Sequence, residues 1–185
     1  IHGNPMTTIL INNRFQKKNE AKISILSNAF MRGVGVFETM RTFDDKNLFR
    51  EKDHINRLFK SAKAISLKPK YSKAETLRQL HKVVTKSPNK LQRIKIVLTE
   101  GYMIIVSTKT AEKKKLKKGV SCTTVECQRS LPKIKSISYL ASYLSHEKAV
   151  KLKSYDAILI DKKGEVFEGA YSNIFWFEGD HLCTR

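Results

Sequence analysis

Residues 155–177 read YDAILIDKKGEVFEGAYSNIFWF, and the fold of the second half of the chain can be read from this stretch. The apolar, β-branched runs YDAILID and EVFEG flank the turn sequence DKKG, and the run NIFWF follows them. Such runs, separated by Gly, Asp and Asn, predict strands, and the first two would form a hairpin. Upstream, we expect a strand in GVSCTTVEC (119–127) and a helix over 137–153.

The first half of the chain mixes predicted strands with two predicted helices. The stretches TTILINNRF (7–15) and VFETMRTF (36–43) are rich in β-branched residues and predict strands. Apolar residues recur at helical spacing over 51–65, which predicts an amphipathic helix. Ser72 followed by Glu75 matches the capping-box pattern, so a second helix is expected to start there.

Two more strands are predicted in RIKIVLT (93–99) and YMIIVST (102–108). Only Glu100 and Gly101 separate them, so the connection is either a tight hairpin or a place where a loop is missing between Gly101 and Tyr102. Strands and helices segregate along the chain. This pattern favours an α+β fold over a doubly wound parallel sheet.

The run AEKKKLKKG (111–119) is the best linker candidate, because its lysines repel one another and bury nothing. We therefore expect an N-terminal α+β domain over 6–112, a basic linker over 113–118 and a second domain over 119–185.

The composition argues against several classes of function. A net charge of +19 would suit nucleic acid, but the lysines spread along the chain without interleaved aromatic residues, so no nucleic-acid partner is expected. Cys122, Cys127 and Cys183 have neither CxxC spacing nor a histidine at metal-site spacing, so we expect no metal and no disulfide frame. No apolar run approaches the ~20 residues of a membrane span. A cytoplasmic protein without membrane contact is expected.

Three stretches carry residues suited to chemistry: GVGVFETMRTF with HINRL downstream, IKSISYL, and DKKGEVFEGAYSNIFWF. Each has an ordinary structural explanation when it is taken alone. His54 and Arg57 could lie on the polar face of their helix, Glu168 could end a hairpin strand, and Lys135 could be a solvated charge.

Taken together and in this order, the three stretches resemble the class IV aminotransferases, the fold-type IV pyridoxal-phosphate (PLP) enzymes, from about Thr7 to the last residue. That family includes branched-chain aminotransferases, D-amino-acid aminotransferases and aminodeoxychorismate lyases. The resemblance implies two α+β domains and a homodimer. It also implies that 119–185 is the first part of a cofactor-binding domain that is incomplete here, since relatives continue beyond DHLCTR (180–185) to a turn that completes the phosphate site.

The resemblance also implies roles for individual residues. Lys135 matches the lysine that holds PLP as a Schiff base and later moves the substrate proton. Glu168 matches the carboxylate beside the pyridine nitrogen, and Arg57 matches the arginine that binds the phosphate. Tyr139 resembles the tyrosine near the ring's phenolic oxygen. Further polar residues expected around the cofactor are Ser172 and Asn173.

On the substrate side, Phe37 and Arg41 resemble pocket positions, although a packed aromatic and a strand charge would explain them equally well. The implied function is transfer of an amino group between an amino acid and a 2-oxo acid. The alternatives are an aminodeoxychorismate lyase, which releases pyruvate to give 4-aminobenzoate, and a non-catalytic scaffold. Glu100 stands where D-amino-acid aminotransferases carry an arginine, which disfavours D-amino acids.

Overall fold

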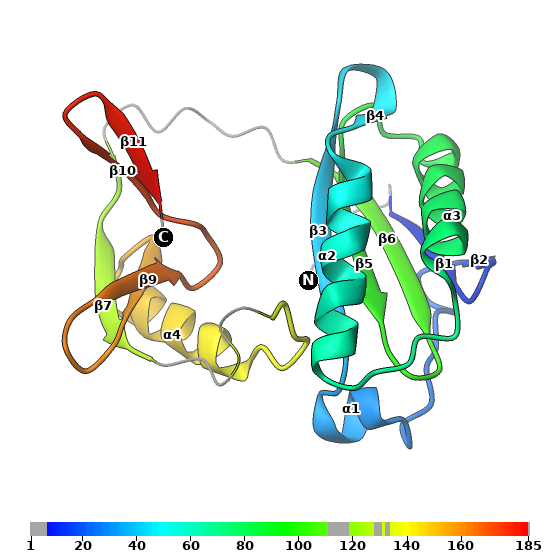
Figure 1. Ribbon diagram of the computed structural model, residues 1–185, viewed down its shortest axis with the longest axis horizontal. Helices are drawn as coiled ribbons and strands as arrows, with labels where there is room; N and C mark the ends of the chain where they lie inside the picture. Colours follow the sequence, from blue (N-terminus) through cyan, green and yellow to red (C-terminus); the bar gives the residue numbers. More distant parts are fainter. Residues whose placement is uncertain (1–6, 111–118, 128–130, 132–133, 185) are drawn as a thin grey trace. The chain divides into compact units, whose positions relative to one another are not determined.

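The computed structural model describes residues 7–110, 119–127, 131 and 134–184, and the chain divides into two compact units (Figure 1). The first unit contains the chain up to residue 112 and also residues 133–138, and the second contains the remainder. Segment 133–138 therefore groups with the first unit, although the sequence assigned it to the second domain. The predicted linker over 113–118 lies outside the described residues.

The first unit is built on an antiparallel sheet, in which the described strands have the order β2-β1-β6-β5-β3-β4. This sheet agrees with the predicted α+β class. The strands are β1 (Thr8–Ile11), β2 (Arg14–Gln16), β3 (Val36–Phe43), β4 (Asn47–Leu48), β5 (Gln92–Leu98) and β6 (Met103–Lys109).

Helices α2 (Glu51–Ala64) and α3 (Lys73–Lys86) lie on one face of this sheet (Figure 1). Both were predicted, including the capping box, in which the Ser72 hydroxyl accepts from the backbone N–H of Glu75. The apolar side chains of the helices and of the covered sheet face form one core. Among its fully buried members are Leu10, Val36, Leu58, Leu80, Val83, Ile94, Ile96, Met103 and Ile105.

Two local features of the first unit differ from the sequence prediction. The stretch 7–15 was expected to be a single strand, but it folds back on itself as the β1–β2 hairpin. Asn12 and Asn13 form the turn with φ of 47° and 67°, in the left-handed region that a tight hairpin requires and that Asn tolerates. A short helix, α1 (Asn28–Arg32), was not predicted; Ser27 caps its start.

The connection between β5 and β6 is a tight hairpin in this chain. Leu98 pairs with Met103, and the backbone N–H of Thr99 donates to the carbonyl oxygen of Tyr102 at 2.9 Å. Glu100 and Gly101 therefore suffice for the turn, and the two strands stay paired in register up to it.

The second unit contains a three-stranded sheet of order β7-β8-β9 and a separate hairpin, β10–β11. Helix α4 connects the parallel strands β7 and β8, and β9 returns antiparallel to β8 through the predicted DKKG turn. The described elements are β7 (Cys122–Glu126), α4 (Leu140–Lys151), β8 (Asp156–Ile160), β9 (Val166–Gly169), β10 (Phe175–Glu178) and β11 (His181–Thr184). Its core is small and consists of Val125, Ala149, Ala157, Leu159 and Ala170.

Helix α4 starts later than the sequence predicted, because the residues before it pair with the first unit. The carbonyl oxygen of Gly35 accepts from the backbone N–H of Ile137 at 3.1 Å, and Ser136 forms a bridge with Val36. These backbone bonds hold the residues up to Ile137 against β3, and α4 begins only at Leu140. In the described part of the chain, no helix is long and apolar enough to cross a membrane.

Candidate active site

Lys135 lies in the segment that pairs with the start of β3. Its backbone carbonyl oxygen accepts from the N–H of Phe37 at 2.8 Å. The approach requires a glycine at position 35, because a Cβ there would lie 2.8 Å from the Ile137 side chain and 3.0 Å from the carbonyl oxygen of Leu98. Residues far apart in sequence thus place the lysine beside β3.

The side chain of Phe37 is buried and contacts two amines. The Nζ of Lys135 lies 5.6 Å from the centre of the Phe37 ring, and the Nζ of Lys95 lies 4.6 Å from it, both within range of a cation–π interaction. Lys95 is exposed by area, but crowding around its amine, together with the charge of Arg93, lowers the pKa of Lys95. Lys95, which pairs with Thr39 across the sheet, was not singled out from the sequence.

Arg57 is hydrogen-bonded to the buried carboxylate of Glu38, a residue that was not singled out from the sequence. Glu38 is fully buried, and its oxygens accept from Arg57 Nε at 2.5 Å, from Arg57 Nη2 at 2.8 Å and contact His54 Nδ1 at 3.0 Å. Burial alone would raise the pKa of Glu38, but the hydrogen bonds and charges of His54 and Arg57 outweigh it and lower that pKa. A charged residue among the apolar residues of VFETMRTF was the available signal.

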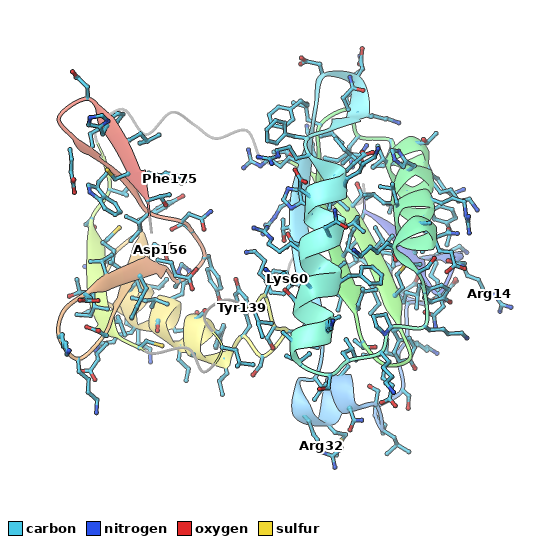
Figure 2. The ribbon with its side chains drawn as sticks, in the orientation of Figure 1. Arg14, Arg32, Lys60, Tyr139, Asp156 and Phe175 are labelled. Carbon is cyan, nitrogen blue, oxygen red and sulfur yellow. The ribbon has the colours of Figure 1, made fainter. Side chains whose placement is uncertain are left out.

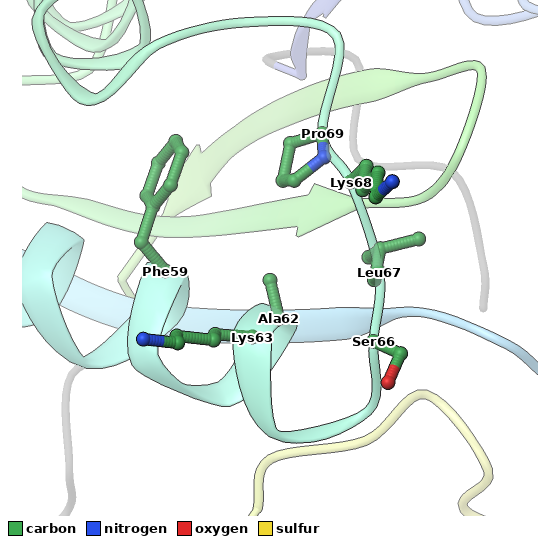
Figure 3. A pocket seen from close by; sticks show the side chains of 7 residues that line it. All are labelled: Phe59, Ala62, Lys63, Ser66, Leu67, Lys68 and Pro69. Carbon is green, nitrogen blue, oxygen red and sulfur yellow. The ribbon is translucent and has the colours of Figure 1, made fainter.

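Arg41 is exposed on β3 and borders a hollow of about 280 Å³. The other lining residues come from β3, β5, α2 and the turn before α2: Thr39, Met40, Phe43, Phe49, His54 and Arg93. A larger hollow, of about 440 Å³, lies at the end of α2 (Figure 3), and its lining includes none of the predicted site residues.

In the second unit, Tyr139 stands immediately before α4 (Figure 2). Its ring stacks on that of Tyr171, with ring centres 5.6 Å apart and planes 3° apart. The ring of His146, from α4, lies 4.7 Å from Tyr171 on centres. The aromatic contacts therefore fix the turn that follows β9 against the start of α4.

The turn after β9 is also held by a buried carboxylate. The Ser172 hydroxyl donates to Asp156 Oδ2 at 2.8 Å, while Asp156 Oδ1 accepts from the N–H of Ala157 and lies 3.3 Å from His146 Nδ1. Glu168 is half-buried on β9, and Asn173 is exposed after Ser172. Asp156 and His146 were not predicted, because the contact between them depends on how α4 packs on β8.

The predicted site residues fall into two groups. Lys135, Phe37, Arg41 and Arg57 belong to the first unit, where Lys135 contacts Phe37. Those of the second unit are Tyr139, Glu168, Ser172 and Asn173. Within the described residues, no cluster of His, Cys, Asp and Glu could hold a metal ion, and the three cysteines are free thiols.

The antiparallel α+β unit and the β-α-β unit that follows it match the fold of the fold-type IV branched-chain aminotransferases. A family model described as amino-transferase class IV matches residues 35–185, and the chain belongs to this family.

Two curated relatives illustrate the similarity. The chain is 30% identical to a D-alanine aminotransferase of Staphylococcus epidermidis, a match that covers 97% of this chain and 69% of the relative. It is 29% identical to a putative branched-chain-amino-acid aminotransferase of Methanocaldococcus jannaschii, over 95% of this chain and 67% of the relative. The chain thus spans about two thirds of the length of these proteins.

Solved structures show the same fold. The branched-chain aminotransferase of Thermoproteus uzoniensis, solved with norvaline, superposes with a TM-score of 0.84 at 25% identity, over 96% of this chain and 67% of that one. A T.th. branched-chain amino acid aminotransferase, solved with pyridoxamine 5'-phosphate, also gives a TM-score of 0.84, at 24% identity, over 95% and 65% of the two chains.

Family membership makes the protein an aminotransferase of class IV, a family of PLP-dependent enzymes. The relatives named above are all aminotransferases, and they support neither the lyase nor the scaffold alternative. They include both D-alanine and branched-chain enzymes, so family membership alone does not fix the choice of amino acid.

Proposed function

We propose that this aminotransferase moves an amino group between an amino acid and a 2-oxo acid, with PLP bound covalently to Lys135. The supporting observation is the position of Lys135. Its backbone is hydrogen-bonded to β3, and its amine lies over the buried Phe37 ring instead of extending freely from the surface. A lysine held in this way is suited to bond an aldehyde carbon and then to take part in proton transfer.

The chemistry of the available donors fits PLP. Arg57 offers a fixed guanidinium for the phosphate, and the Glu168 carboxylate would keep a pyridine nitrogen protonated. Tyr139 would donate toward the phenolic oxygen of the ring, and Ser172 and Asn173 would line the site with polar groups. PLP, when bound, supplies an electron sink for the electron pair left on the substrate α-carbon.

The protein's own residues would carry out the proton transfers. The Lys135 amine, once free, would take the proton from the α-carbon of the amino acid and donate it to the cofactor carbon that carries the nitrogen. Hydrolysis would then release the 2-oxo acid and leave the amino group on the cofactor for the acceptor. Phe37 packs beneath this amine and would limit its movement, while Arg41 would border the substrate pocket.

The preference between amino-acid enantiomers is part of the proposal. Glu100 occupies the β5–β6 turn, is exposed and accepts from Asn28 Nδ2 at 3.1 Å. Its negative charge would repel a substrate carboxylate placed at that turn, so we propose L-amino acids as donors.

The assembly and the compartment are also proposed. Large apolar side chains around α1, among them Leu26, Phe30 and Met31, are exposed and favour a homodimer. The free cysteines favour the reducing cytoplasm. We expect neither a nucleic-acid partner nor a membrane partner.

The test compares the wild-type protein with Lys135→Ala and with Lys148→Ala, which removes an exposed lysine of α4. With added PLP, the wild type and Lys148→Ala should show a visible absorbance band. After borohydride reduction, mass spectrometry should place the adduct on the Lys135 peptide. Lys135→Ala should show neither signal. A wild type without a band, or a reduced adduct that persists in Lys135→Ala, would refute the proposal.

The same preparations would then be tested with both enantiomers of alanine, leucine and glutamate and a panel of 2-oxo acid acceptors. Faster transfer from the L-enantiomers is expected. Faster transfer from D-alanine would instead show that Glu100 does not exclude D-amino acids.

A further inference from the structure

Glu38 is a fully buried acidic residue of the first unit. It lies on β3 between Val36 and Met40, on the sheet face that α2 covers, and has no exposed surface. A buried carboxylate is costly unless it is paired and hydrogen-bonded, and an apolar side chain of similar size usually serves stability at least as well. The position of Glu38 therefore calls for an explanation beyond stability.

The contacts of Glu38 point to Arg57. Its two oxygens accept from Nε and Nη2 of Arg57, which use the two parallel N–H groups along one edge of the guanidinium. A bidentate pair of this kind fixes the plane of the guanidinium as well as its position.

The other edge of Arg57 faces away from Glu38. The side chain of Arg57 is 52% exposed although its partner is completely buried, so the Nη1 edge is open to a ligand. A guanidinium carries five N–H groups, and those that do not point at Glu38 suffice for a second, planar contact with a phosphate.

His54 completes the arrangement one turn earlier on α2. Its Nδ1 lies 3.0 Å from Glu38 Oε2, the oxygen that also accepts from Arg57 Nη2. This third contact restricts rotation of the carboxylate, so the direction in which Arg57 presents its open edge is determined by β3 and α2 together.

We propose that Glu38 is a positioning residue that orients Arg57 so that its open N–H edge binds the phosphate of the cofactor. The inference rests on the proposed function, in which Arg57 binds that phosphate. Glu38 acts through Arg57 and has no contact with the cofactor itself. Its effect should therefore depend on whether the ligand carries a phosphate.

The experiment measures the dissociation constants of PLP and of pyridoxal, which lacks the phosphate, by absorbance titration. In the wild type, PLP should bind much more tightly than pyridoxal. Glu38→Gln keeps the shape of the side chain and removes its charge. It should weaken PLP binding by roughly ten-fold, within the usual range of coupling between contacting residues, and leave pyridoxal binding unchanged within about two-fold.

A double-mutant cycle with Arg57→Ala separates positioning from packing. Once Arg57 is absent, Glu38→Gln should no longer change the ratio of PLP to pyridoxal affinity. Glu51→Gln is the matched control, because Glu51 also pairs with a histidine, His81, at 3.2 Å in the same unit. That control should leave the ratio at the wild-type value.

Circular dichroism shows whether Glu38→Gln folds. If it does not, Glu38→Asp and His54→Asn are measured in its place. Each should lower the ratio of PLP affinity to pyridoxal affinity, by a smaller factor than is expected for Glu38→Gln. Equal weakening of PLP and pyridoxal, or a lowered ratio that persists without Arg57, would show a merely structural ion pair and overturn the inference. A wild type that does not prefer PLP over pyridoxal would refute the phosphate role of Arg57 itself, and with it both proposals.

Discussion

Among single residues, Gly169 shows how a missing side chain shapes the turn after β9. A Cβ at this position would lie 2.2 Å from Ser172 Oγ and 2.9 Å from Asp156 Oδ2. The backbone N–H of Gly169 donates to the carbonyl oxygen of Ser172 at 2.8 Å, which closes the turn. The hydrogen bond between Ser172 and Asp156 therefore exists because glycine leaves room for it.

We predict that Gly169→Ala lowers the free energy of unfolding by about 1–3 kcal/mol, the usual cost of overpacking. The added methyl group must displace the Ser172 hydroxyl and break its bond to Asp156. Urea unfolding followed by tryptophan fluorescence measures the change. Lys148→Ala is the control, since Lys148 is an exposed residue of α4 in the same unit.

In a Ser172→Ala background, the clash with the hydroxyl is gone, so Gly169→Ala should cost less than in the wild type. Equal costs in the two backgrounds would contradict the steric explanation.

Among the secondary-structure elements, α3 has a start that is determined by residues within its own sequence. The Ser72 hydroxyl accepts from the N–H of Glu75, and the Glu75 carboxylate accepts from the N–H of Ser72 at 2.8 Å. This reciprocal pair satisfies backbone donors that the first helical turn leaves without partners. The bond from the Ser72 backbone N–H to the carboxylate also lowers the pKa of Glu75, and the Ser72 hydroxyl adds to this effect.

We predict that Ser72→Ala lowers the free energy of unfolding by about 1 kcal/mol, the typical cost of a lost helix cap. Ser72→Asp retains an oxygen that can accept from the same N–H and should restore most of the loss. Urea denaturation followed by far-ultraviolet circular dichroism is the measurement. Equal unfolding midpoints for Ser72→Ala and the wild type would show that the cap does not stabilise the fold.

Across the chain as a whole, the two units have cores of very different make-up. The first unit buries large side chains from both helices and the sheet. The second buries mainly alanines around Leu159, which is 1% exposed on β8. Small side chains bury less apolar surface and therefore contribute less to stability. The second unit consequently depends strongly on Leu159.

We predict that Leu159→Ala lowers the free energy of unfolding of the second unit by about 2–5 kcal/mol. Hydrogen exchange of the backbone amides of β8 and α4, measured by mass spectrometry over a urea series, reports the opening of this core. The urea midpoint of that transition should fall in Leu159→Ala and stay unchanged in Leu152→Ala, whose side chain is 58% exposed. Similar midpoints for both variants would contradict this assignment of the core.

Elements with local signals could be predicted directly from the order of residues. The helical spacing of Ile55, Leu58 and Ala62 predicted α2, the Ser72 and Glu75 pair predicted the start of α3, and β-branched runs predicted β3, β5 and β6. The three motifs likewise led to the aminotransferase family, which the comparisons confirmed.

Contacts between residues distant in sequence became visible only in the folded chain. The pairing of Lys135 with Phe37, the bond of Glu38 to Arg57 and the contacts of Asp156 with Ser172 join separate elements. A hydrogen bond between distant residues leaves no periodic pattern in either segment, because it depends on how strands and helices pack. For that reason the motif lysine and arginine could be singled out by reading the chain, whereas the contact between Glu38 and Arg57 could not.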